Sequence, residues 1–399
     1  MKYDVIIVGA GIVGLASGLK LLERFPSIKI LFLEKENDIA MHQTGNNSGV
    51  IHSGIYYKTG SLKSQNCIHG YKLLVDFCRL HHVSYNICGK IILATGEKEI
   101  PAMNSIYERG VQNGLDGLKI LDESELKQIE PHAHGVSAIW VPQTGIIDYK
   151  IVSQKYLEVS KSLGAEILFG RKVDDILIKD NECKVVAGSE SYTSKVVVTC
   201  TGLFSDRIAK LTHQNLDYRL IPFRGEYYKL VSSAHHLVKN LIYPVPDPAF
   251  PFLGVHFTRM INDEVECGPN AVLSFKREGY SKFSINLLDT FETFSWGGFR
   301  KIIGKYWKTG LGEFYRSYNK SAFVKALQKL VPEIQSQHLE KGGAGVRAQA
   351  CMKDGKLLDD FYILEDQNII HVCNAPSPAA TASLSIGEYI ATRILNQLV

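Results

Sequence analysis

Three glycines near the start of the chain constrain its fold more than any other feature. Gly9, Gly11 and Gly14 follow the apolar run Tyr3–Val8 and open Ile12–Arg24, where apolar residues repeat at helical spacing. In such a strand–turn–helix the first glycine permits a tight turn, the second lets a phosphate approach the backbone, and the third allows close packing of helix on strand. The spacing therefore predicts a buried strand, a phosphate-binding turn and a helix.

A carboxylate downstream indicates the kind of phosphate ligand. Glu34 lies twenty residues after Gly14, at the end of the apolar run Ile28–Leu33. An acid at this place accepts a hydrogen bond from the ribose of an adenine dinucleotide and repels the 2′-phosphate of NADP. A structural turn with a solvated glutamate is the alternative, but it does not explain why strand, helix and acid occur together. We therefore predict a site for an adenine dinucleotide.

The place of the motif in the chain favours FAD over NAD. It begins almost at the first residue, and no second motif of this kind follows a predicted strand. Two later segments suit an extended cofactor: Gly202, which ends a buried strand, and a helix expected over Ala379–Leu398, whose first N–H groups could stabilise charge on a flavin. Their alternatives are a simple turn glycine and a capped helix that begins at a proline.

The order of the predicted elements indicates the fold class. Parallel strand–helix signals occur at the start, middle and end of the chain, and alternating strands lie between them. We predict an α/β fold (α+β overall), with a Rossmann-like FAD-binding domain and a discontinuous antiparallel-sheet substrate domain. The predicted ranges are 1–88, 145–218 and 342–399 for the FAD-binding domain, and 89–144 and 219–341 for the substrate domain.

Composition excludes several other classes. The 399 residues are 45% hydrophobic, as in globular proteins, and a net charge of +4 is too small to indicate nucleic-acid binding. Met1–Leu22 resembles a secretory signal, but Asp4 and the patterned glycines favour a strand and a turn. The eight cysteines include no Cys-x-x-Cys pair, so we expect no metal centre and a reducing, cytoplasmic compartment.

A longer loop carries a family resemblance. Gly45–Tyr57, with the sequence GNNSGVIHSGIYY, together with the glycine motif resembles the D-amino-acid-oxidase-like superfamily of FAD-dependent oxidoreductases. Within it the loop is similar to that of the L-2-hydroxyglutarate dehydrogenase (oxidase) family. Further similar segments are Gly254–Arg259, Gly268–Val272, Gly345–Arg347 and Ala375–Ser383. The resemblance spans nearly the whole chain. It implies oxidation of L-2-hydroxyglutarate to 2-oxoglutarate by hydride transfer to FAD, with electrons passed to a membrane quinone or to oxygen.

The motif, the acid and the loop together predict a set of residues that contact FAD. These are Gly9, Gly11, Ile12, Val13, Gly14, Glu34, Lys35, Thr44, Asn46, Asn47, Ser48, His52, Val173, Gly202, Ala379, Ala380 and Thr381. Some relatives attach flavin covalently through a histidine, for which His42 and His52 are candidates. We expect non-covalent binding.

The implied substrate is a dicarboxylate with a hydroxyl group, and its oxidation requires a base for the hydroxyl proton. His256 lies in a predicted strand comparable to one that places a histidine at the flavin in related glycerol-3-phosphate dehydrogenases. In the same relatives an arginine that matches Arg347 meets the anionic substrate. The alternatives are a structurally bonded histidine and a structural ion pair.

Three more residues are candidates for the substrate site. Lys276 and Arg277 offer cations for the second carboxylate, since a buried carboxylate requires a charged partner. Tyr57 aligns with an active-site tyrosine of a relative. A solvated strand end for the two cations, and core packing for the tyrosine, are the alternatives.

A basic segment suggests a membrane partner. Residues 300–329 contain eight lysines or arginines and one acid, Glu313, a charge of +7 in a chain whose total is +4. Interleaved aromatic residues suit a surface that rests on anionic lipid. Because a quinone-reducing enzyme must reach the bilayer, we expect peripheral contact at the cytoplasmic face of the inner membrane. A solvated helix face, or a field that steers an anionic substrate, are the alternatives.

Two rival functions stay open from the sequence. One is a related oxidase that acts on an amino acid or amine, and the other is a flavin-binding electron carrier without its own substrate. The proximity of basic candidates to His256 favours an enzyme over a carrier.

Overall fold

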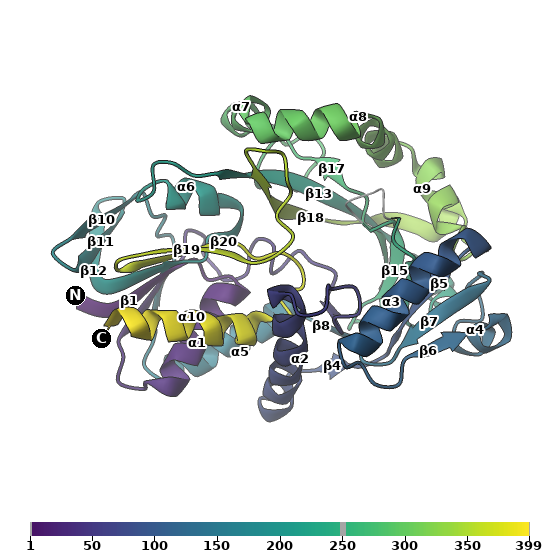
Figure 1. The fold of residues 1–399 in the computed structure, drawn as a ribbon, viewed down its shortest axis with the longest axis horizontal. Coiled ribbons are helices and arrows are strands. Elements are labelled where there is room, and N and C mark those ends of the chain that lie inside the picture. Colours follow the sequence, from purple (N-terminus) through teal and green to yellow (C-terminus); the bar gives the residue numbers. More distant parts are fainter. Residues whose placement is uncertain (1, 248–252, 399) are drawn as a thin grey trace.

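The α/β fold class is confirmed by the computed structural model, which describes residues 2–247 and 253–398. Two large sheets lie side by side along the long axis of the molecule, and both termini lie at the same end (Figure 1). No helix within the described ranges has both the length and the apolarity required to cross a bilayer. All eight cysteines, each in the described part of the chain, are free thiols.

The first sheet has eight strands and contains the glycine motif. Its parallel strands are β1 (Lys2–Val8), β2 (Ile30–Leu33), β9 (Glu166–Leu168), β12 (Glu190–Thr199) and β20 (Ile369–Asn374). Its antiparallel strands are β10 (Asp175–Lys179), β11 (Glu182–Ala187) and β19 (Tyr362–Asp366). β1 lies between β2 and β12, and its fully apolar run is buried on both faces, as is typical of a central parallel strand.

Helices cover the first sheet through one large apolar core. These helices are α1 (Ile12–Arg24), α2 (Leu62–Leu80), α5 (Tyr149–Ser162) and α10 (Ser383–Leu398), whereas α6 (Ser205–Ala209) packs beside β20. α1 packs against both α5 and α10, because its apolar residues form a wide buried face.

The second sheet has nine strands. They are β5 (Lys90–Ala94), β6 (Lys119–Leu121), β7 (Ser137–Val141), β13 (Tyr218–Leu230), β14 (Leu241–Pro244), β15 (His256–Arg259), β16 (Val265–Gly268), β17 (Val272–Leu273) and β18 (Leu339–Met352). A small third sheet consists of β3 (Val50–Ile51), β4 (Tyr85–Asn86) and β8 (Gly145–Ile147). Helices α3 (Ile100–Gln112), α4 (Glu123–Ile129), α7 (Leu287–Ser295), α8 (Gly297–Tyr318) and α9 (Lys320–Leu327) accompany the second sheet.

Two elements differ from the sequence prediction. The predicted boundary at residue 342 falls inside β18, which pairs with β13 along its whole length, so residues 342–352 belong to the second sheet. Helix α3 was not predicted, because Pro101 suggests a helix break; it lies in the first turn, where proline is tolerated. The other domain ranges stay a prediction.

Candidate active site

A cavity of about 1400 Å³ lies between the two large sheets. It exceeds the roughly 300–1,000 Å³ of ordinary small-molecule pockets. The ends of β1, β2 and β12 open into it from one side, and β13, β15 and β18 line it from the other. The carboxyl edge of a parallel sheet is the usual ligand site of such folds. The cavity therefore has room for an extended cofactor and a small substrate.

The glycine turn forms one wall of the cavity. Gly9 has φ +101°, and a Cβ there would lie 2.5 Å from the carbonyl oxygen of Cys200. A Cβ on Gly14 would lie 2.1 Å from the Gly9 oxygen, so the turn and helix require glycine at both positions. The N-cap of α1 is Gly11, which has no side chain, and the Ile12 N–H donates to Thr44 Oγ1 at 3.1 Å. The first turn lines the cavity, and the positive end of the helix suits the pyrophosphate of FAD.

Glu34 is fixed at the same wall. Its carboxylate accepts hydrogen bonds from the N–H groups of Ala10, at 2.7 Å, and Glu36, at 3.0 Å. Because each carboxylate oxygen has two lone pairs, both can still accept a ribose hydroxyl. The geometry fits the predicted role of Glu34 toward the adenosine half of FAD.

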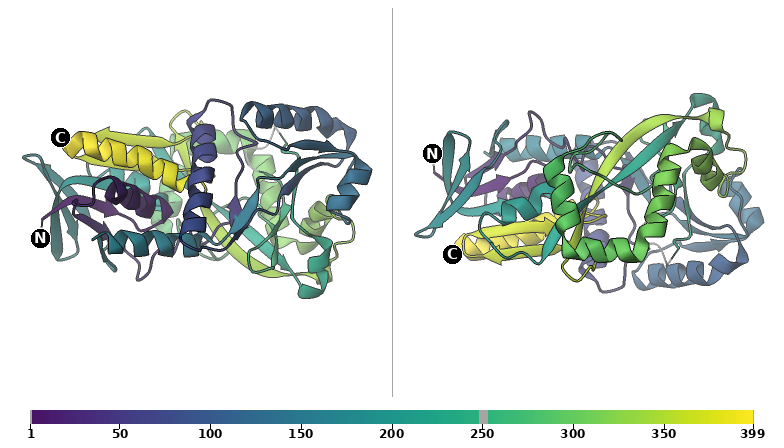
Figure 2. Two further views of the ribbon diagram at one scale, coloured as in Figure 1. Left: turned by 90° about the horizontal axis from the view of Figure 1, so that it is seen from below. Right: turned by 90° about the horizontal axis from the view of Figure 1, so that it is seen from above.

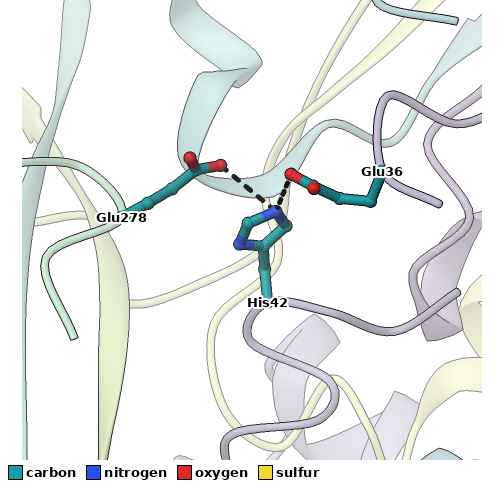
Figure 3. A group of neighbouring side chains, drawn as sticks. All are labelled: Glu36, His42 and Glu278. Atoms are coloured by element: carbon teal, nitrogen blue, oxygen red, sulfur yellow. Dashed lines mark hydrogen bonds and ion pairs between the residues drawn. The ribbon is translucent and has the colours of Figure 1, made fainter. Parts of the chain in front are cut away.

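An ionic cluster joins the two sides of the cavity near Glu34. His42 Nε2 lies 2.9 Å from Glu36 Oε1 and 3.1 Å from Glu278 Oε1 (Figure 3). Of the described residues, these three have ligand atoms close enough together to hold a metal ion. The ammonium of Lys35 already binds both carboxylates, so the cluster contains its own cation. Hydrogen bonds from Lys35 and then His42 lower the pKa of Glu36.

The predicted cofactor residues gather at this cavity with two exceptions, and their contacts with FAD stay a prediction. Those that line it are Gly9, Gly11, Ile12, Val13, Glu34, Lys35, Thr44, Asn46, Asn47, Ser48, His52, Val173, Gly202, Ala379 and Ala380. Gly14 and Thr381 lie behind the wall. The buried Thr381 Oγ1 bonds the Tyr149 hydroxyl at 2.7 Å and accepts the His52 N–H at 3.0 Å, so Thr381 supports the wall instead of lining it.

The last helix begins later than predicted. α10 starts at Ser383, and residues 379–382 form the turn that precedes it. Pro376 and Pro378 have no N–H to donate, and the turn is instead closed by bonds from Ala379 and Ala382 to the carbonyls of these prolines. Ala379 and Ala380 thus line the cavity as turn residues, not as the first turn of a helix.

His256 lies on β15 and lines the cavity on the side away from the glycine turn. Its hydrogen bonding suits a proton acceptor. Its Nδ1 donates to the Gly254 carbonyl at 2.8 Å, which leaves a lone pair on Nε2. Burial and, to a lesser degree, the nearby charges of Lys90 and Arg347 lower the pKa of His256 to about 4, although the hydrogen bond to Gly254 opposes this shift. The Tyr243 ring packs against the imidazole at 3.9 Å between centroids. His256 is therefore neutral at neutral pH.

Arg347 and Lys63 are among the cations that line the cavity together with His256. The side chain of Arg347, on β18, faces the cavity. Because the surrounding protein shields it from bulk solvent, the pKa of its guanidinium is lowered. Lys63, on α2, pairs with Asp359 at 2.7 Å and lies 4.9 Å from the centre of the Tyr57 ring. Tyr57 lines the cavity as predicted, whereas Lys63 was not predicted, because nothing in its local sequence distinguishes it from a surface lysine.

The structure contradicts the predicted role of Arg277, and Lys276 does not line the cavity. The buried guanidinium of Arg277 binds the carboxylate of Asp206 and donates to the Leu203 carbonyl at 2.7 Å. It also pairs with Glu292 at 3.1 Å. A desolvated cation requires such partners, and these acids come from distant parts of the chain. Neither residue is placed to bind a substrate carboxylate.

Comparison with known proteins defines the class. Residues 4–393 match the family described as FAD dependent oxidoreductase, and the chain belongs to this family. Among curated relatives, the L-2-hydroxyglutarate dehydrogenase of Indibacter alkaliphilus is 55% identical over 388 residues, which cover 97% of each chain. The mitochondrial L-2-hydroxyglutarate dehydrogenase of Nematostella vectensis is 44% identical over 98% of this chain and 90% of its own. Within the wider family the chain thus belongs with the L-2-hydroxyglutarate dehydrogenases, which confirms the resemblance found in the sequence.

A solved structure shares the fold. L-α-glycerophosphate oxidase from Mycoplasma pneumoniae, with FAD bound, matches 99% of this chain and 95% of its own with a TM-score of 0.81. The sequence identity is 21%, so this likeness concerns the fold alone.

Proposed function

We propose that this protein oxidises L-2-hydroxyglutarate to 2-oxoglutarate. The observation that carries the proposal is that His256, with a free Nε2 lone pair, and Arg347 line the cavity that begins at the dinucleotide turn. The family to which the chain belongs, and the printed names of its relatives, support the same substrate.

The chain supplies binding and proton transfer. FAD, when bound against the α1 turn and Glu34, supplies the acceptor for the substrate Cα hydrogen and its electron pair. His256 Nε2 accepts the hydroxyl proton, and the Gly254 carbonyl holds the imidazole in the tautomer that this requires. The low pKa of His256, caused mainly by burial, keeps the base free before substrate binds.

The cations orient the substrate. The planar fork of Arg347 suits one carboxylate, which it binds with two parallel hydrogen bonds. Lys63 is already paired with Asp359, so it adds little net charge. Tyr56, Tyr57 and Tyr243 line the same cavity and exclude water from the reacting carbon.

Turnover with a panel of substrates tests the proposal. The purified protein should convert L-2-hydroxyglutarate to 2-oxoglutarate, with slower or no turnover of the D-enantiomer and of L- and D-amino acids. Faster turnover of an amino acid would favour the amine-oxidase alternative. No turnover of any compound by a protein that retains FAD would favour the electron carrier.

We also propose that one face of the molecule rests on an anionic membrane, where electrons pass to quinone. α7, α8 and α9 lie along one edge of the molecule (Figure 1), and the right panel of Figure 2 views that edge directly. Large side chains that are each more than half exposed gather there: Phe283, Ile285, Leu287, Leu288, Phe291, Trp307, Leu311, Tyr315 and Tyr318. Arg300, Lys301, Lys305 and Lys308 are exposed on α8. Apolar residues beside basic ones suit the surface of an anionic bilayer at the cytoplasmic face of the inner membrane.

Vesicle flotation tests this membrane face. The parent should float with phosphatidylglycerol vesicles at low salt and less with neutral vesicles, because both charge and apolar burial contribute. Leu287→Ser combined with Phe291→Ser should reduce the floated fraction by about tenfold or more, since each side chain contributes roughly 1.5–3 kcal/mol when buried. Leu80→Ser, at an equally exposed position on α2, is the matched control. Absence of the parent from the floated fraction at low salt would rule out the proposed contact.

A further inference from the structure

Lys90 is a lysine enclosed directly behind the substrate end of the cavity. It opens β5, and only 1% of its surface is exposed. Its ammonium lies 4.5 Å from the centre of the Tyr56 ring and 4.9 Å from that of Tyr243. Both rings line the cavity, so one layer of aromatic side chains separates the Lys90 ammonium from the space where we expect the substrate. The sequence signal for it is a lysine at the start of a fully buried strand.

Two other buried cations, Arg277 and Arg224, have acidic partners, whereas Lys90 has two aromatic rings instead. Arg277 pairs with Asp206, and Arg224 pairs with Glu226 at 2.8 Å. In residues 2–247 and 253–398 no carboxylate pairs with Lys90. The faces of two aromatic rings compensate a buried ammonium only in part. A negative charge brought by a substrate would therefore stabilise the protonated form of Lys90.

The charged groups around Lys90 are basic except for one carboxyl, that of Glu266. His52, His256 and Arg347 lie on the cavity side, and the thiol of Cys67 lies nearby. Burial raises the pKa of Cys67 to about 12, so this thiol stays neutral. Behind Tyr243 lies Glu266, and burial raises the pKa of its carboxyl to about 7, which weakens its ability to neutralise the region. Burial raises the pKa values of Tyr56 and Tyr243, so the two rings of the wall carry no charge.

We infer that Lys90 is a positioning residue that makes the site selective for substrates with a second negative charge. The inference rests on the proposed function and deepens it. Arg347 binds one carboxylate, Lys63 is neutralised by Asp359, and the charge of Lys90 acts through the wall of Tyr56 and Tyr243 on the other carboxylate. Charges separated by a protein wall interact strongly, because the effective dielectric constant there is far below that of water.

The selectivity should depend on pH. Burial lowers the pKa of Lys90 to about 7, so its charge is present below this pH and is lost as the pH rises through it. A compound with two carboxylates loses this interaction, whereas its γ-amide has no second charge to lose. Because both compounds use the same base, the ratio of their kcat/KM values isolates the effect of Lys90 from that of His256.

The experiment compares L-2-hydroxyglutarate with its γ-amide. In the parent, the ratio of kcat/KM values should favour the dicarboxylate and should decline from about pH 6 to about pH 9. In Lys90→Met and in Lys90→Gln the ratio near pH 6 should be lower by about tenfold or more. It should also decline less with pH than in the parent, since only Glu266 then titrates near the wall. Lys353→Met is the matched control: it removes an exposed lysine at the end of β18 that is paired with Asp217 outside the cavity, and it should leave the ratio unchanged.

Binding of glutarate, which cannot be oxidised, is measured by the change in flavin absorbance. This measurement distinguishes a failure of the proposed function from a failure of the proposed role of Lys90. A parent that neither oxidises L-2-hydroxyglutarate nor binds glutarate contradicts the proposed function itself. A parent that does both, with a ratio constant over pH, overturns the role of Lys90 even without a folded variant. An unchanged ratio in either variant does the same.

Discussion

Replacing His256 by glutamine should lower kcat/KM for L-2-hydroxyglutarate by about 100- to 10,000-fold, the range that a general base contributes. Glutamine keeps a hydrogen-bonding group near the Gly254 carbonyl but offers no basic nitrogen. Because His256 lies outside the glycine turn, the variant should retain FAD, and absorbance of the purified protein checks this. Stopped-flow reduction of the flavin measures the loss directly.

The pH profile gives the same base a second signature. Burial lowers the pKa of His256 to about 4, so Nε2 is unprotonated above that pH and is lost as a proton acceptor below it. The acid limb of kcat/KM in the parent should therefore lie well below the usual histidine pKa of about 6.5. His235→Gln is the matched control, because His235 also bonds a backbone carbonyl, that of Leu230, but lies outside the cavity. If the flavin of His256→Gln were reduced as fast as that of the parent, His256 would not be the base.

Replacing Arg347 by methionine should lower kcat/KM by about 30- to 1,000-fold or more, the usual effect of removing one partner of an enclosed charge pair. The loss should appear mainly in KM, since the guanidinium binds a carboxylate that is present before and after the reaction. Arg347→Lys should recover only part of the activity, because an ammonium lacks the planar fork.

The control for Arg347 comes from the neighbouring strand. Arg219, on β13, stacks on Trp296 and donates to the Glu292 carbonyl at 2.7 Å, away from the cavity. Arg219→Met should leave KM unchanged. If Arg347→Met retained the parent KM for L-2-hydroxyglutarate, the carboxylate would have to be bound elsewhere.

The cofactor end of the site is predictable because its constraints are local. The turn requires glycine at Gly9 and Gly14, and Glu34 follows at a fixed spacing on the next parallel strand. Neighbouring elements in one strand–helix–strand unit leave these residues little freedom, so the spacing in the sequence determines their place in space.

The substrate end is less predictable because it combines distant segments. Arg277 was expected at the substrate, but Asp206 and Glu292 bind it, and no local pattern indicates that these acids lie beside it. Lys90 and Lys63 were missed for the same reason: their relation to the cavity depends on how β5 and α2 pack against loops elsewhere in the chain.

The exposed surface of α7 and α8, for which membrane contact stays a proposal, could be anticipated only in part from the sequence. Residues 300–329 were identified by their charge, and they form most of α8 together with α9. The apolar side chains of Phe283 to Phe291 were not included, because an apolar helix is ordinarily buried. Only the structure shows that α7 exposes Leu287 and Phe291 next to the basic residues of α8.

Anaerobic mixing of the purified protein with L-2-hydroxyglutarate tests whether its bound flavin accepts electrons from this substrate. The purified protein should be yellow, its flavin bands should bleach within the mixing experiment, and 2-oxoglutarate should form in an amount equal to the bleached flavin. A yellow protein whose spectrum does not change with L-2-hydroxyglutarate, or a protein that stays colourless after incubation with FAD, would contradict the account.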